Sequence, residues 1–94
     1  MIINEIKLLN ASTYKHYIDY IPVINTSWWL CTCGDSKNSM QFVDDTGMIN
    51  HYGISIRDRC GVRPALAVTE LDASPGDTIK LFAFDWTVLD KHLL

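Results

Sequence analysis

The chain has 94 residues, of which 48% are hydrophobic, and a formal net charge of −3. Its length fits one domain spanning residues 1–94, and three Trp, four Tyr and three Phe supply apolar surface for a core, which excludes a largely disordered chain. Eight Lys and Arg residues without a basic stripe argue against nucleic-acid binding, and no apolar run approaches the roughly 20 residues of a membrane-spanning helix.

The cysteine content indicates the cellular compartment. Three cysteines make an odd count, and the first residues are too polar for a secretory signal, with Asn4, Glu5 and Lys7 close to the start. Disulfide-stapled secreted domains usually carry an even number of cysteines. The sequence therefore predicts a cytoplasmic protein in a reducing environment.

The first predicted element is a strand over residues 2–9. Ile2, Ile6 and Leu8 fall on one side of an alternating pattern, with Asn4 between them. Alternation with a period of two is typical of a strand with one buried face. We therefore expect Ile2 and Ile6 to share a face.

A short helix is expected next, over about residues 12–20. Asn10 belongs to a polar run whose side-chain oxygens can cap the free N–H groups of a first helical turn. Tyr14 and Tyr17 follow at helical spacing, and Pro22 ends the segment because the residue before a proline avoids the helical conformation.

The middle of the chain predicts strands and one hairpin. Residues 27–31 form a compact apolar strand, and residues 33–39 form a polar loop. Residues 40–43 and 48–52 flank a four-residue turn that ends on Gly47, which tolerates a positive φ. This combination is typical of a β-hairpin.

The last third is also rich in strand signals. An irregular connection over residues 53–60 leads to a strand over residues 62–71, and the loop 72–77 follows. Residues 78–89 predict one long strand or two strands with a turn near Ala83. The strict alternation that favours one strand runs through Phe82, Phe84, Trp86 and Val88. The fold class expected is therefore α+β, with a small strand-rich mixed or antiparallel sheet and one short N-terminal helix.

The cysteines are candidates for metal or nucleophilic chemistry. In a strand, the one-residue spacing of Cys31 and Cys33 places both thiols on one face, where Cys60 and a histidine could complete a metal site. Cys60 with His51 or His92 as its base is the corresponding nucleophilic hypothesis. The favoured interpretation is that all three are structural thiols and that the protein uses no cofactor, because no second closely spaced Cys/His pair exists.

Two tryptophans and an arginine mark the expected core. Successive strand residues point to opposite faces, so either Trp28 or Trp29 enters the core and the other points outward or lies beneath a loop. We assign Trp29, Arg63 and Trp86 to structural roles and Trp28 to the surface. Arg63 stands in an apolar stretch, where a guanidinium needs carbonyl or carboxylate partners, so we expect it to hold loops together.

Four segments carry a family resemblance. Residues 28–34 resemble a Trp-Trp-Leu-Arg-Ser-Pro-Gly motif, residues 61–66 match Gly-Val-Arg-Pro-Ala-Leu without change, and residues 42–49 and 80–89 are similar to the strands of the same family. It is a family of uncharacterised domains from gut-type Firmicutes and their phages. In this chain Cys31-Thr32-Cys33 replaces the Arg-Ser-Pro of the motif.

The resemblance implies a C-type-lectin-like fold, in the superfamily that also holds formylglycine-generating enzymes and retroelement-diversified binding proteins. Long loops would then form a ligand surface, here from residues 33–39 and 50–60. The residues that we expect to contact a partner are Trp28, Asn50, His51, Tyr52, Arg57 and Asp58. No catalytic residue is carried over from the family.

The function predicted is that of a non-enzymatic binding module with a protein partner. A phage-encoded inhibitor of a host defence protein is one concrete form, and a small molecule or glycan is a further candidate ligand. Two alternatives stay open: a cysteine-based enzyme or metal-binding protein, and a structural domain that forms homo-oligomers.

Overall fold

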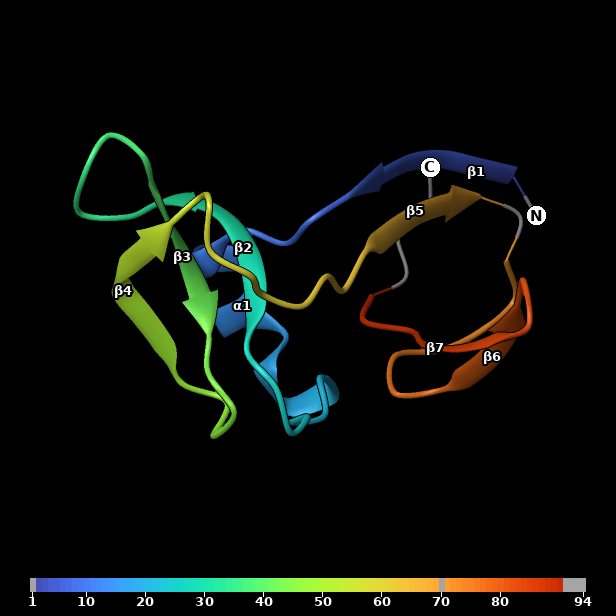
Figure 1. Ribbon diagram of the computed structural model, residues 1–94. Coiled ribbons are helices and arrows are strands. Elements are labelled where there is room, and N and C mark those ends of the chain that lie inside the picture. Colours follow the sequence, from blue (N-terminus) through green and yellow to red (C-terminus); the bar gives the residue numbers. More distant parts are fainter. Residues whose placement is uncertain (1, 70, 91–94) are drawn as a thin grey trace.

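The computed structural model describes residues 2–69 and 71–90, which form one short helix and several antiparallel strands (Figure 1). The elements are β1 (Ile2–Lys7), α1 (Ala11–His16), the 3-10 turn η1 (Ile18–Tyr20), β2 (Trp28–Cys33), β3 (Ser39–Val43), β4 (Ile49–Ser55), β5 (Ala65–Thr69), β6 (Thr78–Leu81) and β7 (Phe84–Thr87). The predicted α+β class with one short N-terminal helix is confirmed. None of the helices in the described ranges is long and apolar enough to cross a membrane.

The strands form three separate sheets rather than the single small sheet expected. They are the pair β1–β5, the three-stranded sheet in the order β2–β3–β4, and the hairpin β6–β7, and every pairing is antiparallel. Within the described chain the parallel component is one isolated bridge between Trp28 and Gly61.

Helix α1 starts where the sequence predicts but ends earlier. Asn10 is its N-cap, and the side-chain oxygen of Asn10 accepts a hydrogen bond of 2.7 Å from the backbone N–H of Thr13. At Tyr17, with φ −106° and ψ 15°, the backbone leaves the helical conformation, and η1 continues as a tighter turn. The expectation of a continuous helix to residue 20 is therefore wrong.

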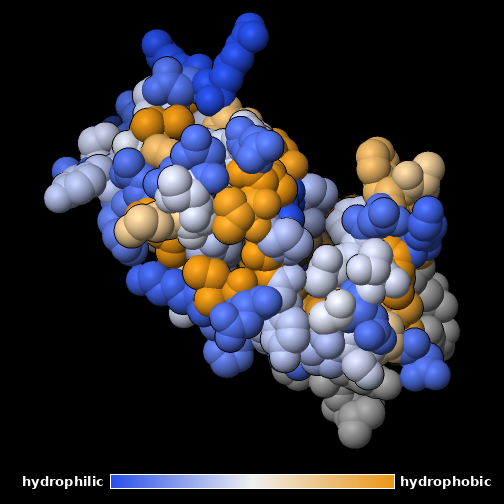
Figure 2. Space-filling model, turned by 90° about the horizontal axis from the view of Figure 1, so that it is seen from below, coloured by the Kyte–Doolittle hydropathy of each residue, from blue (hydrophilic) through white to orange (hydrophobic). Residues whose placement is uncertain are grey.

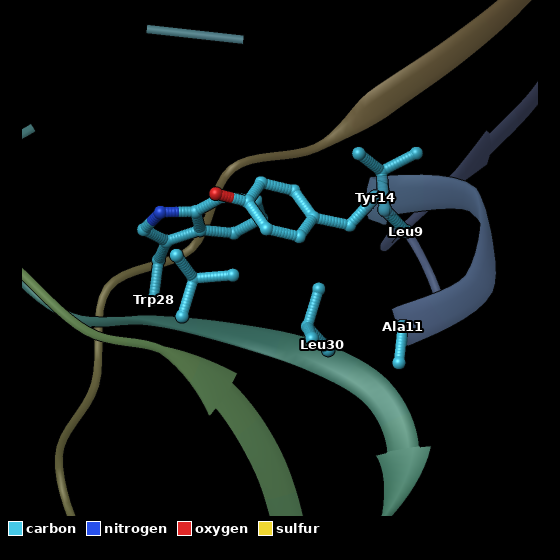
Figure 3. Close-up of a cluster of buried hydrophobic side chains, with 6 residues drawn as sticks. Leu9, Ala11, Tyr14, Trp28 and Leu30 are labelled. Carbon is cyan, nitrogen blue, oxygen red and sulfur yellow. The ribbon is translucent and has the colours of Figure 1, made fainter. Parts of the chain in front are cut away.

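The main core lies between α1 and β2 (Figure 3). The Tyr14 ring meets the Trp28 indole edge to face, with ring centres 5.3 Å apart and planes at 81°. The Tyr14 hydroxyl donates a hydrogen bond of 2.6 Å to the carbonyl of Gly47, at the end of the β3–β4 turn. The other buried members are Leu9, Ala11, Leu30 and Val43. One tyrosine thus joins the helix to the central hairpin.

The C-terminal segment is a hairpin, so the turn near Ala83 is the correct alternative and the single long strand is wrong. Phe82 and Ala83 have φ values of 54° and 65° and link β6 to β7. Positive φ at both central residues is the type I′ geometry, which suits the twist of paired strands. The turn leaves Phe82 exposed, whereas Trp86 donates a hydrogen bond of 3.1 Å to the carbonyl of Leu81 and is half-buried.

The chain thus forms two halves (Figure 1). The helix–sheet half contains α1, η1 and the sheet β2–β3–β4, and the ribbon half contains the pair β1–β5 and the hairpin β6–β7. The buried cluster around Trp28 belongs to the helix–sheet half, whereas the described strands β1, β5, β6 and β7 contain no buried hydrophobic residue and only Val88, directly after β7, is buried.

Candidate functional site

The two tryptophans are placed in the opposite way to the sequence-based assignment. Trp28 is 2% exposed and packs in the core, whereas Trp29 is half-buried. Trp28 shares its face of β2 with Leu30, which α1 covers, so this face is the interior one. Assigning Trp28 to a partner-contacting surface was therefore wrong for this structure, because its side chain does not reach the surface.

Arg63 lies against Trp28 and joins two loops. Its guanidinium carbon is 4.9 Å from the centre of the indole ring, and its Nη1 donates a hydrogen bond of 2.9 Å to the carbonyl of Pro22. Burial lowers the pKa of Arg63 from its usual value, and the nearby Tyr14 hydroxyl opposes that shift. The guanidinium stays charged at neutral pH and fits the role of a structural tie.

A bulge in β4 presents the predicted contact residues. Met40 pairs with Ile54 and Phe42 with Asn50, so two steps along β3 correspond to four along β4. The additional residues include His51 and Tyr52, and Tyr52 is 75% exposed. A bulge interrupts the strand ladder and redirects side chains, which is the physical reason for this exposure.

Two glycines fix the bulge against the loop 33–39. Gly53 has φ 79°, and a Cβ there would lie 2.5 Å from the carbonyl oxygen of Met40. A Cβ on Gly34 would lie 2.5 Å from the carbonyl oxygen of Tyr52. The Asn50 side-chain oxygen also accepts a hydrogen bond of 3.1 Å from the N–H of Gly53. Backbones this close allow little movement of the bulge without loss of contact.

The loop 33–39 is also tied to β4 through its backbone. Asp35 N–H donates to the carbonyl of Tyr52 at 2.8 Å, and Ile56 N–H donates to the carbonyl of Asn38 at 2.9 Å. The buried Ser39 hydroxyl closes the loop by donating to the Ser36 carbonyl at 3.0 Å. The loop is therefore hydrogen-bonded to β4 and to the turn after it, beside the bulge.

The charged residues of the predicted surface lie in the turn after β4. The N–H of Asp58 donates to the carbonyl of Ser55 at 2.9 Å, which places Arg57 at the tip of this turn. Arg57 and Asp58 are both exposed, and neither forms an ion pair with another residue in the ranges 2–69 and 71–90. Both charges are therefore accessible from solvent. We call Asn50, His51, Tyr52, Arg57 and Asp58 the β4 surface.

The cysteines do not assemble into a site within the described residues. Cys31 and Cys33 are exposed on β2, and the Cys31 thiol donates to the carbonyl of Leu8 at 3.4 Å. Cys60 is half-buried, and burial raises the pKa of its thiol. No group of three or more His, Cys, Asp or Glu side chains in that part of the chain could hold a metal ion. His92, the other histidine proposed as a base, lies outside the described residues.

A groove lies between the two halves, and the sequence did not predict it. It has a volume of about 1060 Å³, and Figure 2 shows an indentation between the two halves. All of β5 lines it, together with Tyr17, Tyr20 and Arg63. The Tyr17 hydroxyl also donates a hydrogen bond to the carboxylate of Asp90. The helical spacing of Tyr14 and Tyr17 predicted the helix, but nothing in it indicated that Tyr17 would line a groove.

Comparison with known proteins found no matching protein family, no matching curated protein and no matching solved structure.

Proposed function

We propose that this chain is a non-enzymatic binding module that recognises another protein through the β4 surface. The observation that carries the proposal is the bulge in β4, which holds Tyr52 at 75% exposure where the backbones of β4 and the loop 33–39 approach closely at Gly34 and Gly53. A large aromatic side chain directed into solvent gains no burial within the chain. A partner that covered it would remove that apolar area from water.

The composition of the β4 surface supports a protein partner. Tyrosine and arginine are the residue types that most often dominate the energy of protein interfaces, and Tyr52 and Arg57 are both exposed here. His51, Asn50 and Asp58 add hydrogen-bonding groups of both kinds. A mixed surface of this type selects partners by shape and hydrogen bonding rather than by net charge.

Rigidity of the surface also favours binding. Ordering a loop at the moment of association costs free energy, and a loop that is already held in place avoids that cost. The hydrogen bonds from Asp35 to Tyr52 and from Ile56 to Asn38 hold both sides of the bulge before any partner arrives. The free energy gained by burying Tyr52 against a partner is then not reduced by a cost of ordering the chain.

The proposal includes the finer expectations from the sequence. In a C-type-lectin-like arrangement the long loops would form the ligand surface, and these loops are segments 33–39 and 50–60. A cytoplasmic location favours a protein over an extracellular glycan, and an inhibitor of a host defence protein would be one such binding module.

The test captures partners from a lysate of the native host and quantifies them by mass spectrometry. It compares the unchanged chain with the variant Tyr52→Ala and with the triple variant Tyr52→Ala/Arg57→Ala/Asp58→Ala. Any partner found is then titrated, and we expect Tyr52→Ala to weaken it at least tenfold, or about 1.4 kcal/mol. Phe84→Ala is the matched control, because Phe84 is 68% exposed but lies on β7. Partners that bind the triple variant as tightly as the unchanged chain would overturn the proposal.

A further inference from the structure

The ribbon β1–β5 has one apolar face, which is created by a bulge. Ile3 pairs with Val68 and Ile6 pairs with Leu66, with a register shift between Ile3 and Glu5. Residues directly opposite one another in antiparallel strands project to the same side, and the extra residue at the bulge changes which residues of β1 share a side. Ile3, Ile6, Leu66 and Val68 therefore share a face, which we call the ribbon face.

The sequence-based pairing of Ile2 with Ile6 on one face was wrong for the same reason. Simple alternation counts Asn4 as a normal strand residue, but Asn4 has no partner in the register of β5. Because of the shift, Ile3 rather than Ile2 lies on the same face of β1 as Ile6. A face of mixed character thereby becomes wholly apolar.

Among the described residues, no helix or further strand packs closely on the two strands that form the ribbon face. Ile6 is 68% exposed, and the other three members are only half-buried. Within residues 2–69 and 71–90, no helix or other strand makes more than marginal contact with β1 or β5. A two-stranded sheet is at best marginally stable in water unless its apolar face packs on another layer.

The free edge of β1 is protected, whereas the ribbon face is not. The bulge at Asn4 disrupts the regular row of backbone groups, and Glu5 and Lys7 place two exposed charges 3.7 Å apart on this strand. Bulges and charges are the devices that discourage a further strand from adding to an edge. The favoured contact is therefore face to face, between layers.

The size of the molecule indicates how much surface is left to cover. Its accessible surface is 6737 Å², compared with about 5500 Å² for a folded monomer of its mass. Its radius of gyration is 14.0 Å, compared with about 12 Å for a compact domain of its length. If a two-fold dimer removed this excess from both copies, it would bury about 2500 Å², which lies in the range of stable homodimers.

We propose that the ribbon face is a dimerisation surface and that its occupant is a second copy of this chain. The two ribbon faces pack against each other about a two-fold axis, so that Ile6 of each copy is buried by the other. A two-fold arrangement uses the same patch on both copies and leaves no unpaired surface from which a filament could grow. The β4 surface takes no part in this contact.

The test measures the molar mass of the purified 94-residue chain by light scattering over a dilution series. We expect twice the chain mass of 10.7 kDa, and we expect the mass of Ile6→Lys to fall to that of one chain. Phe84→Lys is the matched control, because Phe84 has the same 68% exposure as Ile6 but lies on β7, and its mass should stay at two chains.

Hydrogen exchange keeps the test decisive if Ile6→Lys does not fold. In the unchanged chain, amides of β1 and β5 should become better protected as the protein concentration rises, whereas those of β4 should not change. A monomer at every concentration, or a dimer whose amide protection rises only in β4 or β7, would overturn the proposal. Binding of a partner by Tyr52 would be unaffected by either result.

Discussion

Replacing Tyr14 by phenylalanine tests the link between the helix and the central hairpin. The change keeps the ring and its edge-to-face contact with Trp28 but removes the hydroxyl that donates to the carbonyl of Gly47 at 2.6 Å. Tyr14 is 2% exposed and Gly47 is buried, so water does not readily replace the lost donor. A buried carbonyl left without its partner costs about 1–3 kcal/mol, and we expect the free energy of unfolding to fall by that amount.

Urea and thermal unfolding measure this effect. In a domain of this size the expected fall in Tm is roughly 4–8 °C for each kcal/mol lost. Tyr52→Phe removes the same hydroxyl from a side chain that is 75% exposed, so its stability should stay within about 0.5 kcal/mol of the unchanged chain. Equal urea midpoints for Tyr14→Phe and the unchanged chain would show that this hydrogen bond does not support the fold.

The pH dependence gives a second measure of the same contact. Burial raises the pKa of Tyr14 above its ordinary value of 10.0 in the folded chain. Below pH 10 the Tyr14 hydroxyl keeps its proton in both the folded and the unfolded chain. Above pH 10 the unfolded chain loses this proton first, so the folded chain binds more protons. The free energy of unfolding therefore falls as the pH rises. The fall should be shallower in Tyr14→Phe, and an identical profile above pH 10 would contradict the assignment.

The other predictions concern the bulge, the arginine tie and the thiols. Gly53→Ala should lower the free energy of unfolding in urea by more than Gly76→Ala. Both glycines have positive φ, so either substitution costs about 1–2 kcal/mol in backbone strain, but only at Gly53 would the new Cβ lie 2.5 Å from a backbone oxygen. Equal losses of stability in the two variants would exclude the clash. Arg63→Ala should lower the free energy of unfolding by about 1–3 kcal/mol in the same assay, because it removes the hydrogen bond to the Pro22 carbonyl and the cation–π contact with Trp28. Arg63→Lys should restore only part of this stability, and full restoration by lysine would argue against the stacked geometry. Alkylation under native conditions, followed by mass spectrometry, should modify Cys60 more slowly than the two exposed cysteines of β2, because burial raises its pKa and limits access, and a faster reaction at Cys60 would contradict this environment.

The sequence by itself determined the local elements of this protein. The Asn10 cap, the turn at Gly47 and the apolar strand around Trp28 depend on short-range rules, namely capping oxygens, positive φ and alternation, and all three lie where the sequence predicts them. The residues of the β4 surface were also named from the sequence, as polar and aromatic side chains of the segment 50–60. What the sequence did not contain was the bulge that exposes them.

Only the tertiary structure decided which face of each strand is interior. Alternation defines two faces of a strand but does not say which face another element will cover. Trp28 rather than Trp29 is buried because α1 packs on the face of β2 that carries Trp28. One extra residue at a bulge exchanges the faces beyond it, which is why Ile3 rather than Ile2 joins Ile6 on the ribbon face. The groove also has no local signal, since its walls are far apart in the chain and meet only when both halves have formed.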